Sequence, residues 1–403
     1  MGIARRINFI VNSHHKGKIM SGFNFVNPVN FYFGQGKLAQ AGTITAQYGK
    51  KALIIASDSA KPTGQLAALV DVLTQAGVTS VCFDRFMQNP LSTLVDEGAT
   101  FAREQQCDVI VGIGGGSAMD MAKGIAFMAC NSGGIWDYVF GQTPADSALP
   151  VVLIPTTAGT GSEANKTAVF TNPQTNDKKG LVNPLIYPKA AIIDPLLMLT
   201  LPRRVIAGPG ADVLFHSLES FISKNAHPMS EMLSLQALEL IGKYLPQVYD
   251  DATNIEAWEK VSFASSLAGM AIDCAGTTLP HALQHPMGGL LDVVHAEGIA
   301  AIYMAFMEFT WQSAPQKFAA IAKALGVNTL NMTEEEAARS SIDAVRSLLG
   351  YVNMLPSLSS LGVKEEHFDW FIGNATTTMR VVLANNPRVP DADEIRAIYQ
   401  QSL

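Results

Sequence analysis

Three short, mostly apolar runs, separated by stretches with helical spacing, constrain the fold of this chain most strongly. The runs lie at residues 52–56, 108–113 and 151–155 and are rich in β-branched side chains, and glycine or proline bounds the last two. Strands that are apolar on both faces occur where helices cover both sides of a parallel sheet. The part of the chain from Lys51 to Asp194 is therefore predicted to be a doubly wound, Rossmann-like α/β domain with a parallel sheet.

The second half of the chain has a different pattern, in which apolar residues recur at helical spacing and strand-like runs are nearly absent. The predicted helices cover residues 211–224, 230–244, 255–271, 298–309, 315–325 and 333–349. A further helix around residues 281–285 is expected to end at Pro286 and Gly288-Gly289.

The length of 403 residues favours two domains. We predict an α/β domain over residues 22–201 and an all-α domain over residues 202–403, with the boundary near Pro202, and a ligand site between them. Residues 1–21 show no periodicity and are interpreted as an N-terminal extension outside the fold.

Charge and composition exclude several classes of partner. The chain has 28 basic and 35 acidic residues, a net charge of −7, and no basic stripe, so neither nucleic acid nor an anionic membrane is expected to bind. The longest apolar run, residues 299–307, is shorter than the ~20 residues that cross a bilayer. The four cysteines are far apart with no CxxC pair, which favours a reducing, cytoplasmic location. Charged residues make up only 16% of the chain, which favours a homo-oligomer that buries surface, with a small molecule as ligand.

A glycine-rich loop directly follows the second predicted strand. It reads Gly114-Gly115-Gly116-Ser117 and opens a helix that includes Asp120. Glycines let a backbone approach a phosphate closely, and free N–H groups at a helix start stabilise its negative charge. The loop predicts a pyrophosphate cradle, although Ser117 takes the third glycine position of the GxGxxG fingerprint. The alternative is a tight turn in which Ser117 and Asp120 form a capping box.

A second loop of hydroxyl and glycine residues follows the third predicted strand. It reads Thr156-Thr157-Ala158-Gly159-Thr160-Gly161-Ser162-Glu163. Open α/β sheets bind ligands at the carboxyl ends of their strands, so two such loops predict a dinucleotide. The adenosine ribose is expected at the tip of the first predicted strand, which reads Ser57-Asp58-Ser59.

Histidines cluster in the helical half. His281 and His285 lie four residues apart, His295 follows ten residues later, and Asp212 and His216 repeat the four-residue spacing upstream. Each pair can face one side of a helix. One carboxylate and three imidazoles suit a divalent first-row metal, and a site with four protein ligands leaves one histidine for proton transfer. The alternative is that each group is a satisfied part of the core or of an interface.

These motifs, together with Phe31-Tyr32-Phe33-Gly34-Gln35-Gly36 and Asn89-Pro90, resemble the iron-containing alcohol dehydrogenase family from about Phe23 to the C-terminus. The resemblance implies a metal bound by Asp212, His216, His281 and His295, with His285 as the histidine near the nicotinamide that does not bind the metal. It also implies coenzyme contacts at Asn89, Gly114, Gly115, Gly116, Ser117, Asp120, Thr156, Thr157, Thr160 and Lys178, beside Ser57 and Asp58 at the ribose.

The same resemblance implies a dehydroquinate synthase-like fold and a homodimer or higher homo-oligomer. It also implies reversible hydride transfer between a primary alcohol and NAD(P)+ that gives an aldehyde. Fe2+ rests on the resemblance alone, because intrinsic affinity at an oxygen/nitrogen site favours Zn2+. NAD(H) is the implied coenzyme. NADP(H) stays open, because relatives that prefer NAD often carry Asp where this chain has Ser57.

Three other functions compete with this one. A dehydroquinate synthase-like lyase needs several basic residues for an acidic sugar substrate. In residues 205–300 the only basic residues other than histidine are Lys224, Lys243 and Lys260. A glycerol dehydrogenase-type polyol oxidoreductase shares the fold but usually has a smaller zinc ligand set. A metal- or nucleotide-binding regulator has no appended interaction domain to support it.

Overall fold

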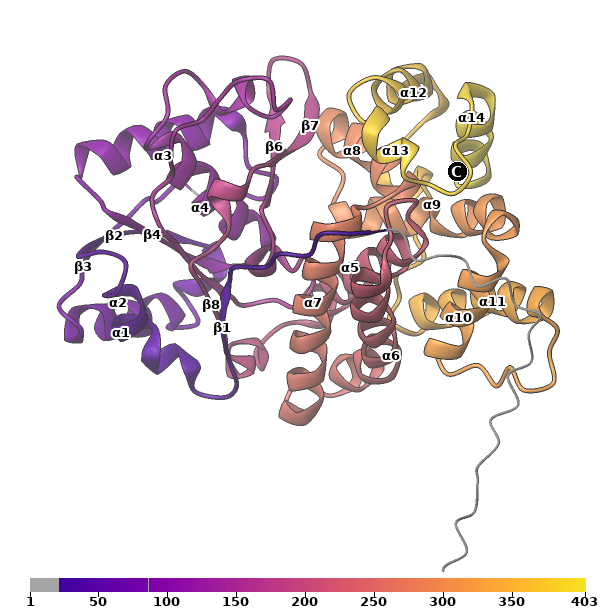
Figure 1. Cartoon of the computed structure of the whole chain (residues 1–403), viewed down its shortest axis with the longest axis horizontal. Coiled ribbons are helices and arrows are strands. Elements are labelled where there is room, and N and C mark those ends of the chain that lie inside the picture. Colours follow the sequence, from indigo (N-terminus) through magenta and orange to yellow (C-terminus); the bar gives the residue numbers. More distant parts are fainter. Residues whose placement is uncertain (1–21, 86) are drawn as a thin grey trace, which may run out of the picture.

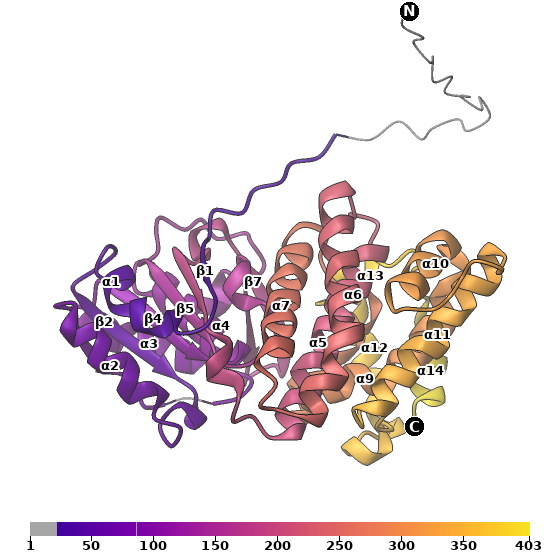
Figure 2. The ribbon, with the colours of Figure 1, turned by 90° about the horizontal axis from the view of Figure 1, so that it is seen from below.

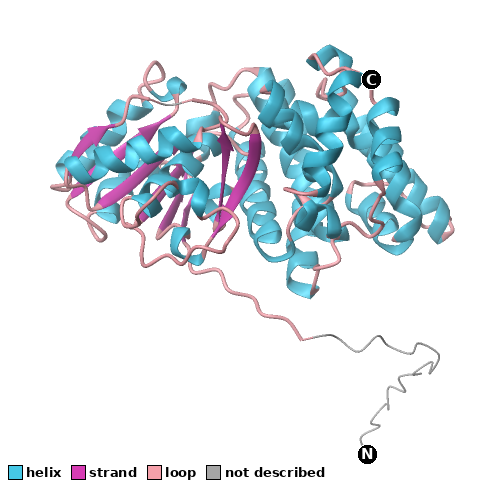
Figure 3. Ribbon diagram, turned by 90° about the horizontal axis from the view of Figure 1, so that it is seen from above, coloured by secondary structure: helices cyan, strands magenta, loops and turns pink. Residues whose placement is uncertain are grey.

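The computed structural model describes residues 22–85 and 87–403, and these form a sheet-containing domain beside a helical domain (Figure 1; Figure 3). The N-terminal extension expected at residues 1–21 lies outside the described residues. Among the described helices, none is both long and apolar enough to span a bilayer.

Six parallel strands form one sheet in the order β1-β8-β5-β4-β2-β3. The strands of this sheet are β1 (Asn30–Phe33), β2 (Lys51–Ala56), β3 (Thr79–Cys82), β4 (Val109–Gly114), β5 (Val151–Pro155) and β8 (Ala190–Ile193). Register pairs Ala56 with Ile113 and Gly114 with Pro155. The three loops that follow β2, β4 and β5 therefore leave the same edge of the sheet side by side, which confirms the arrangement on which the dinucleotide prediction depends.

Helices cover both faces of the sheet, as predicted from its apolar strands. On one face Leu53 and Ile55 of β2 pack in a core with α3 (Ser92–Glu104) and α4 (Gly116–Met128). On the other face, the alternate residues Ala52 and Ile54 pack in a core with α1 (Ala41–Thr45) and α2 (Gln65–Gln75). The doubly wound α/β fold is therefore confirmed.

An antiparallel hairpin that was not predicted extends from this domain. Its strands are β6 (Thr167–Asn172) and β7 (Asp177–Val182), and the hairpin lies against α8 (Figure 1). The sequence hides it because its strands mix polar and apolar residues without a long apolar run.

The rest of the chain forms the predicted all-α domain, whose helices stack away from the sheet (Figure 2). Its helices are α5 (Arg203–Ile222), α6 (Pro228–Asp250), α7 (Ile255–Ala275), α8 (Leu279–Leu291), α9 (His295–Thr310), α10 (Pro315–Ala324), α11 (Glu334–Tyr351), α12 (Phe368–Thr376), α13 (Arg380–Ala384) and α14 (Ala392–Gln401). Helix α5 is buried along nearly its whole length, so groups on it are shielded from water by the surrounding helices.

The expected end of the helix at Pro286 and Gly288-Gly289 is wrong, because α8 runs on to Leu291. Pro286 removes one backbone donor, but packing against α9, α12, α13 and β7 holds the helix. Gly289 meets the hairpin so closely that a Cβ would lie 2.0 Å from the Asn176 carbonyl oxygen. The glycine therefore allows close packing and does not end the helix.

Candidate metal and coenzyme site

Helix α5 presents three acid or imidazole side chains on one face. Asp212, His216 and Glu219 follow one another at spacings of four and three residues, which places them above one another on consecutive turns. All three are buried, at 2%, 5% and 0% exposure. A helix that buries three such groups needs partners for them.

Helices α8 and α9 supply those partners. His281 and His285 lie on α8, and His295 is the first residue of α9. Between the two helices the chain turns at Asp292, which takes a left-handed conformation with φ of 55°. This turn brings His295 back toward the face of α8 that carries the other two histidines.

The four predicted metal ligands meet at one point. One ligand atom each from Asp212, His216, His281 and His295 lies within 4.8 Å of the other three. The Nε2 atoms of His216 and His281 are 3.1 Å apart, and Asp212 Oδ1 lies 3.5 Å from His216 Nε2. Asp212 Oδ1 is buried, yet finds no hydrogen-bond donor among the described residues. A buried carboxylate oxygen without a donor is costly, so this donor set fits a divalent cation.

Two further side chains orient the imidazoles. His281 Nδ1 lies 2.8 Å from Glu219 Oε1, and His295 Nδ1 lies 2.6 Å from Gln284 Oε1. Because each acceptor holds the Nδ1 hydrogen, the Nε2 lone pair of both rings is left for the centre of the cluster.

Burial and charge shift the pKa values of these histidines in different directions. Burial lowers the pKa of His216, with the neighbouring Asp212 carboxylate opposing it. Burial also lowers the pKa of His281, but the Glu219 carboxylate and its hydrogen bond outweigh burial, so the pKa of His281 is raised.

His285 lies beside the cluster and is not one of the four converging groups. Its Nδ1 lies 3.1 Å from the backbone carbonyl oxygen of Lys178 on β7, which leaves Nε2 for proton exchange. Burial, followed by the nearby Lys178 charge, lowers the pKa of His285 well below its usual value. The ring is therefore neutral near pH 7.

The loops after β2, β4 and β5 are packed so tightly that side chains are excluded from the glycine run. A Cβ on Gly116 would lie 2.5 Å from Thr160 Cγ2, and one on Gly115 would lie 3.1 Å from Thr157 Oγ1. Gly114 has φ of 153°, and a Cβ on it would lie 2.8 Å from Ser57 Cβ. The predicted contact residues of the three loops are therefore adjacent, with the start of α4 among them, which fits a phosphate-binding site. Thr156 follows β5 directly, and its N–H donates to the Gly114 carbonyl oxygen.

The capping-box alternative is wrong. Helix α4 begins after Gly115 without a side-chain cap, and Ser117 lies within its first turn. Asp120 instead accepts hydrogen bonds from Ser162 Oγ at 2.6 Å and from the Val169 N–H at 3.0 Å. Asp120 thus ties α4 to the second loop and to β6.

Asn89 and Lys178 lie together next to His285. Lys178 Nζ donates to Asn89 Oδ1 at 2.8 Å, and Lys178 is only 5% exposed. Burial lowers the pKa of Lys178 to about 8. The neighbouring Lys179 points elsewhere, because its Nζ donates to the Thr378 carbonyl oxygen.

The tip of β2 borders a hollow. It is lined by Ala56, Ser57, Asp58, Lys61, Leu66, Cys82, Phe83 and Asp84. Ser57 is 9% exposed and its hydroxyl lies 3.1 Å from that of Ser59, while Asp58 is exposed. Across the rim, Lys61 Nζ pairs with Asp84 Oδ1 at 2.9 Å.

Sequence comparison decides the family. The profile described as "Iron-containing alcohol dehydrogenase" matches residues 28–195, and that of the "Fe-containing alcohol dehydrogenase family, C-terminal" matches residues 206–403. The chain belongs to the iron-containing alcohol dehydrogenase family. It is therefore an oxidoreductase, an alcohol dehydrogenase that transfers hydride between an alcohol and a nicotinamide coenzyme, as the sequence predicted.

Similar members of the family are named as several different dehydrogenases. The 1,3-propanediol dehydrogenase of Klebsiella pneumoniae is 33% identical, over 94% of this chain and 98% of that protein. The NAD-dependent methanol dehydrogenase of Bacillus methanolicus is 32% identical, over 94% of this chain and all of that protein. An archaeal halo-thermophilic alcohol dehydrogenase from a Red Sea brine pool superposes with a TM-score of 0.92 and 33% identity, over 96% of this chain and 100% of that one.

Three residues of this site that act through other residues were not predicted from the sequence. Glu219 and Gln284 orient two imidazoles, and Asp292 carries the turn between α8 and α9. A signal for the first two was present, because Glu219 lies three residues after His216 and Gln284 three residues after His281. No local pattern indicates the contact that Asp292 makes with Asn89, which lies more than two hundred residues earlier.

Proposed function

We propose that Asp212, His216, His281 and His295 bind one divalent metal ion, and that the chain uses it with NAD(H) to interconvert small primary alcohols and aldehydes. The observation that carries this proposal is the convergence of four donor atoms within 4.8 Å around a buried Asp212 oxygen that has no donor among the described residues. The name of the family supports Fe2+ over Zn2+.

The chemistry divides between the bound groups and this chain's residues. When bound, the metal supplies a Lewis acid for the substrate oxygen and the nicotinamide exchanges the hydride. His285 Nε2 takes up the proton that the alcohol loses and returns it when the aldehyde is reduced. Its lowered pKa suits this role, because a proton acceptor must be neutral at the working pH. Glu219 and Gln284 hold two ligand rings in place.

The coenzyme is proposed to lie across the three adjacent loops. The backbone of Gly114, Gly115 and Gly116, with Ser117, holds the pyrophosphate at the start of α4, and Thr156, Thr157 and Thr160 line the opposite side. Asn89 and Lys178 hold the nicotinamide ribose next to His285, which the Lys178–His285 contact supports. Asp120, predicted as a coenzyme contact, is proposed to act indirectly. It accepts a hydrogen bond from Ser162 and so fixes the loop after β5.

The ribose at the adenosine end is proposed to lie at Ser57 and Asp58. Because Ser57 has no charge, the first position after β2 does not repel a 2′-phosphate, and Lys61 lies on the rim of the same hollow. We propose that NAD(H) is the main coenzyme and that NADP(H) also binds. Parallel titrations with NADH and NADPH, followed by nicotinamide fluorescence, give the ratio of the two dissociation constants.

We further propose that the protein is cytoplasmic and that it forms a homodimer or a higher homo-oligomer. Strand β1 lies at the edge of the sheet and pairs only with β8 among the described strands, so one side of it is open to a second copy. Light scattering on the purified protein measures the mass of the assembly.

Metal analysis tests the proposed function. Elemental analysis should find about one Fe or Zn per chain in the purified protein, and Asp212→Ala and His281→Ala should each lose the metal and turnover together. NADH production from simple alcohols separates this function from a lyase that regenerates its NAD within each cycle. Full turnover after complete removal of metal would contradict the proposal.

A further inference from the structure

A polar bridge crosses between the two domains next to the coenzyme residues. Asn89, in the loop after β3, donates from Nδ2 to Asp292 Oδ1 at 2.7 Å. Asp292 follows α8 directly and precedes His295 by three residues. The bridge therefore joins the sheet domain to the turn that connects the two histidine-bearing helices.

Both ends of this bridge have a backbone conformation that few side chains adopt. Asn89 has φ of 51° and Asp292 has φ of 55°. Asn and Asp tolerate the left-handed region better than other non-glycine residues, but still at a cost of about 1 kcal/mol each. Such conformations persist where the surroundings hold them, and they are concentrated at functional sites.

The bridge also fixes the direction of the Asn89 amide. An ionised carboxylate only accepts hydrogen bonds, so the amide must turn its NH2 toward Asp292 and its oxygen toward Lys178. In that orientation Asn89 Oδ1 accepts from Lys178 Nζ at 2.8 Å. With the amide reversed, its NH2 would face the Lys178 ammonium and the contact would be lost.

Lys178 in turn contacts the catalytic histidine. Its backbone carbonyl oxygen lies 3.1 Å from His285 Nδ1, and its side chain is almost wholly buried. A contiguous path of contacts therefore runs from the exposed carboxylate of Asp292, through Asn89 and Lys178, to His285.

We infer that Asp292 is a positioning residue for the coenzyme: through the Asn89 amide it sets the direction of the Lys178 ammonium that meets the nicotinamide ribose. This inference rests on the proposed coenzyme role of Lys178. The positioning effect that we assign to Asp292 passes through its hydrogen bond with Asn89.

Equilibrium binding of NADH to the metal-loaded protein tests this inference without turnover. Asp292→Ala is expected to raise the dissociation constant about tenfold, the scale of a lost hydrogen bond to a charged group. Asp292→Asn keeps an acceptor oxygen and is expected to bind NADH within about twofold of the unchanged protein. Asp292→Gly removes the carboxylate but leaves the turn unstrained, because glycine adopts the left-handed conformation readily. It is expected to weaken NADH binding as much as Asp292→Ala does, because the inference assigns the effect to the carboxylate and not to the turn.

A double-mutant cycle separates positioning from general damage to the fold. In an Asn89→Ala background, Asp292→Ala is expected to cause no further loss of NADH affinity, because the route through the amide is already broken. Additive losses, or full affinity in either Asp292→Ala or Asp292→Gly, would overturn the inference. So would a loss in Asp292→Asn equal to that in Asp292→Ala.

Lys178→Ala distinguishes failure of this inference from failure of the proposed coenzyme role. If Lys178→Ala weakens NADH binding and Asp292→Ala does not, Lys178 keeps its role and Asp292 has none. If Lys178→Ala binds NADH normally, the coenzyme role of Lys178 and the inference built on it both fall.

Discussion

At the scale of single residues, the site separates side chains that meet at the cluster from side chains that hold them. The first kind has a sequence signature, because residue type and spacing indicated a metal site among the clustered aspartate and histidines. The family resemblance implied which of them are ligands, and the structure brings Asp212, His216, His281 and His295 together. The second kind, Glu219 and Gln284, was not predicted. Each lies on the same helix face as a predicted residue, but a glutamate or glutamine inside a helix has no chemical mark until its partner is known.

His285→Ala is expected to keep the metal and lower kcat by about 10²–10⁴, the usual contribution of a general acid or base. The reason is that His285 lies beside the four converging groups and is not one of them. Metal content and kcat, measured on one preparation, test this, with His216→Ala as the control that should lose the metal. Loss of metal from His285→Ala would show that the histidine is a ligand.

Glu219→Gln is expected to weaken metal binding by about 10–100-fold, the range found when a group that orients a ligand histidine is changed. An amide at this position can no longer accept from both His281 Nδ1 and the Thr278 N–H through two charged oxygens. Competition with a chelator of known affinity measures the change. Glu231→Gln, which alters an ion pair with Lys317 outside the cluster, is the control and should retain metal normally.

The lowered pKa of the buried Lys178 lets us predict how NADH binding depends on pH. Burial lowers its pKa to about 8, against the opposing charges of Asp120 and Asp292. A depressed pKa means that the ammonium loses its proton as the pH rises past about 8, so NADH affinity should be steady below that pH and fall above it. Fluorescence titrations on both sides of pH 8 test the sign. Lys178→Met should bind more weakly at every pH and show no such fall.

At the scale of helices and strands, continuous apolar runs and helical spacing were sufficient to predict strands β2, β4 and β5 and helices α5 to α11, whereas strands β1, β3 and β8 and helices α12 to α14 were not predicted. What the sequence could not indicate depends on contacts between distant elements. Hairpin β6–β7 has strands of mixed polarity and is held against α8. The continuation of helix α8 beyond its proline and glycines also depends on such a contact. Gly289 lies next to Asn176 and allows α8 to pack closely against the hairpin.

Gly289→Ala tests this packing. A Cβ there would overlap the Asn176 carbonyl oxygen, which is backbone and cannot turn away, so α8 and the hairpin must separate. We expect a stability loss of about 1–3 kcal/mol, as for other overpacked sites, with weaker NADH binding because Lys178 lies on the displaced strand. Gly373→Ala is the control. Nothing lies within 4 Å of the Cβ that it adds to helix α12, so it should stabilise the protein by about 0.5–1 kcal/mol.

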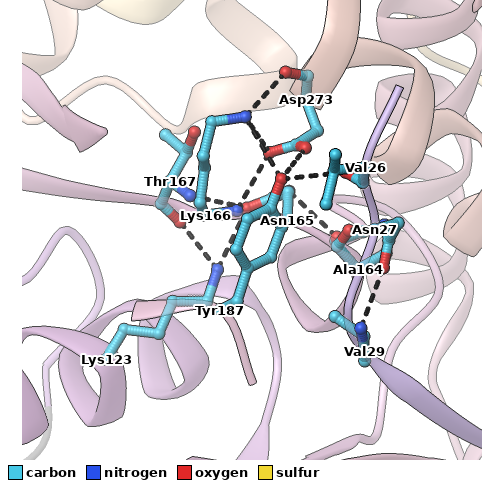
Figure 4. A network of polar contacts seen from close by, with 11 residues as sticks. Val26, Asn27, Val29, Lys123, Ala164, Asn165, Lys166, Thr167, Tyr187 and Asp273 are labelled. Atoms are coloured by element: carbon cyan, nitrogen blue, oxygen red, sulfur yellow. Dashed lines mark hydrogen bonds and ion pairs between the residues drawn. The ribbon is translucent and has the colours of Figure 1, made fainter. Parts of the chain in front are cut away.

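At the scale of the whole molecule, a second polar network joins the two domains away from the metal ligands (Figure 4). Asp273, near the end of α7, accepts from the Lys166 backbone N–H at 3.0 Å and pairs with Lys166 Nζ at 3.0 Å. The Tyr187 hydroxyl donates to the same carboxylate and lies 3.3 Å from Lys166 Nζ. The Asp273 side chain is 2% exposed, so one buried carboxylate of the helical domain holds two side chains of the sheet domain.

A related network inside the sheet domain supports the same region. The wholly buried Lys123 on α4 donates to Ser162 Oγ, Asn165 Oδ1 and the Thr167 carbonyl oxygen at 2.8, 3.0 and 2.7 Å. Because Lys166 directly precedes β6 and follows Asn165, the link to Asp273 and the loop that faces the glycine run are held by one short segment of chain. The seating of the helical domain and the shape of the coenzyme loops are therefore set together.

Asp273→Ala is accordingly expected to affect both stability and coenzyme binding. It leaves the partly exposed Lys166 ammonium without its anion and the Tyr187 hydroxyl without its acceptor, at a cost of about 1–3 kcal/mol in the free energy of unfolding. NADH affinity should fall as well, because the segment before β6 is released from α7. Denaturant unfolding and NADH titration measure the two effects. Asp369→Ala removes an exposed aspartate paired with Arg396 inside the helical domain, and should change stability by less than about 0.5 kcal/mol and leave NADH affinity unchanged. If Asp273→Ala behaves like Asp369→Ala, the network carries no coupling between the domains.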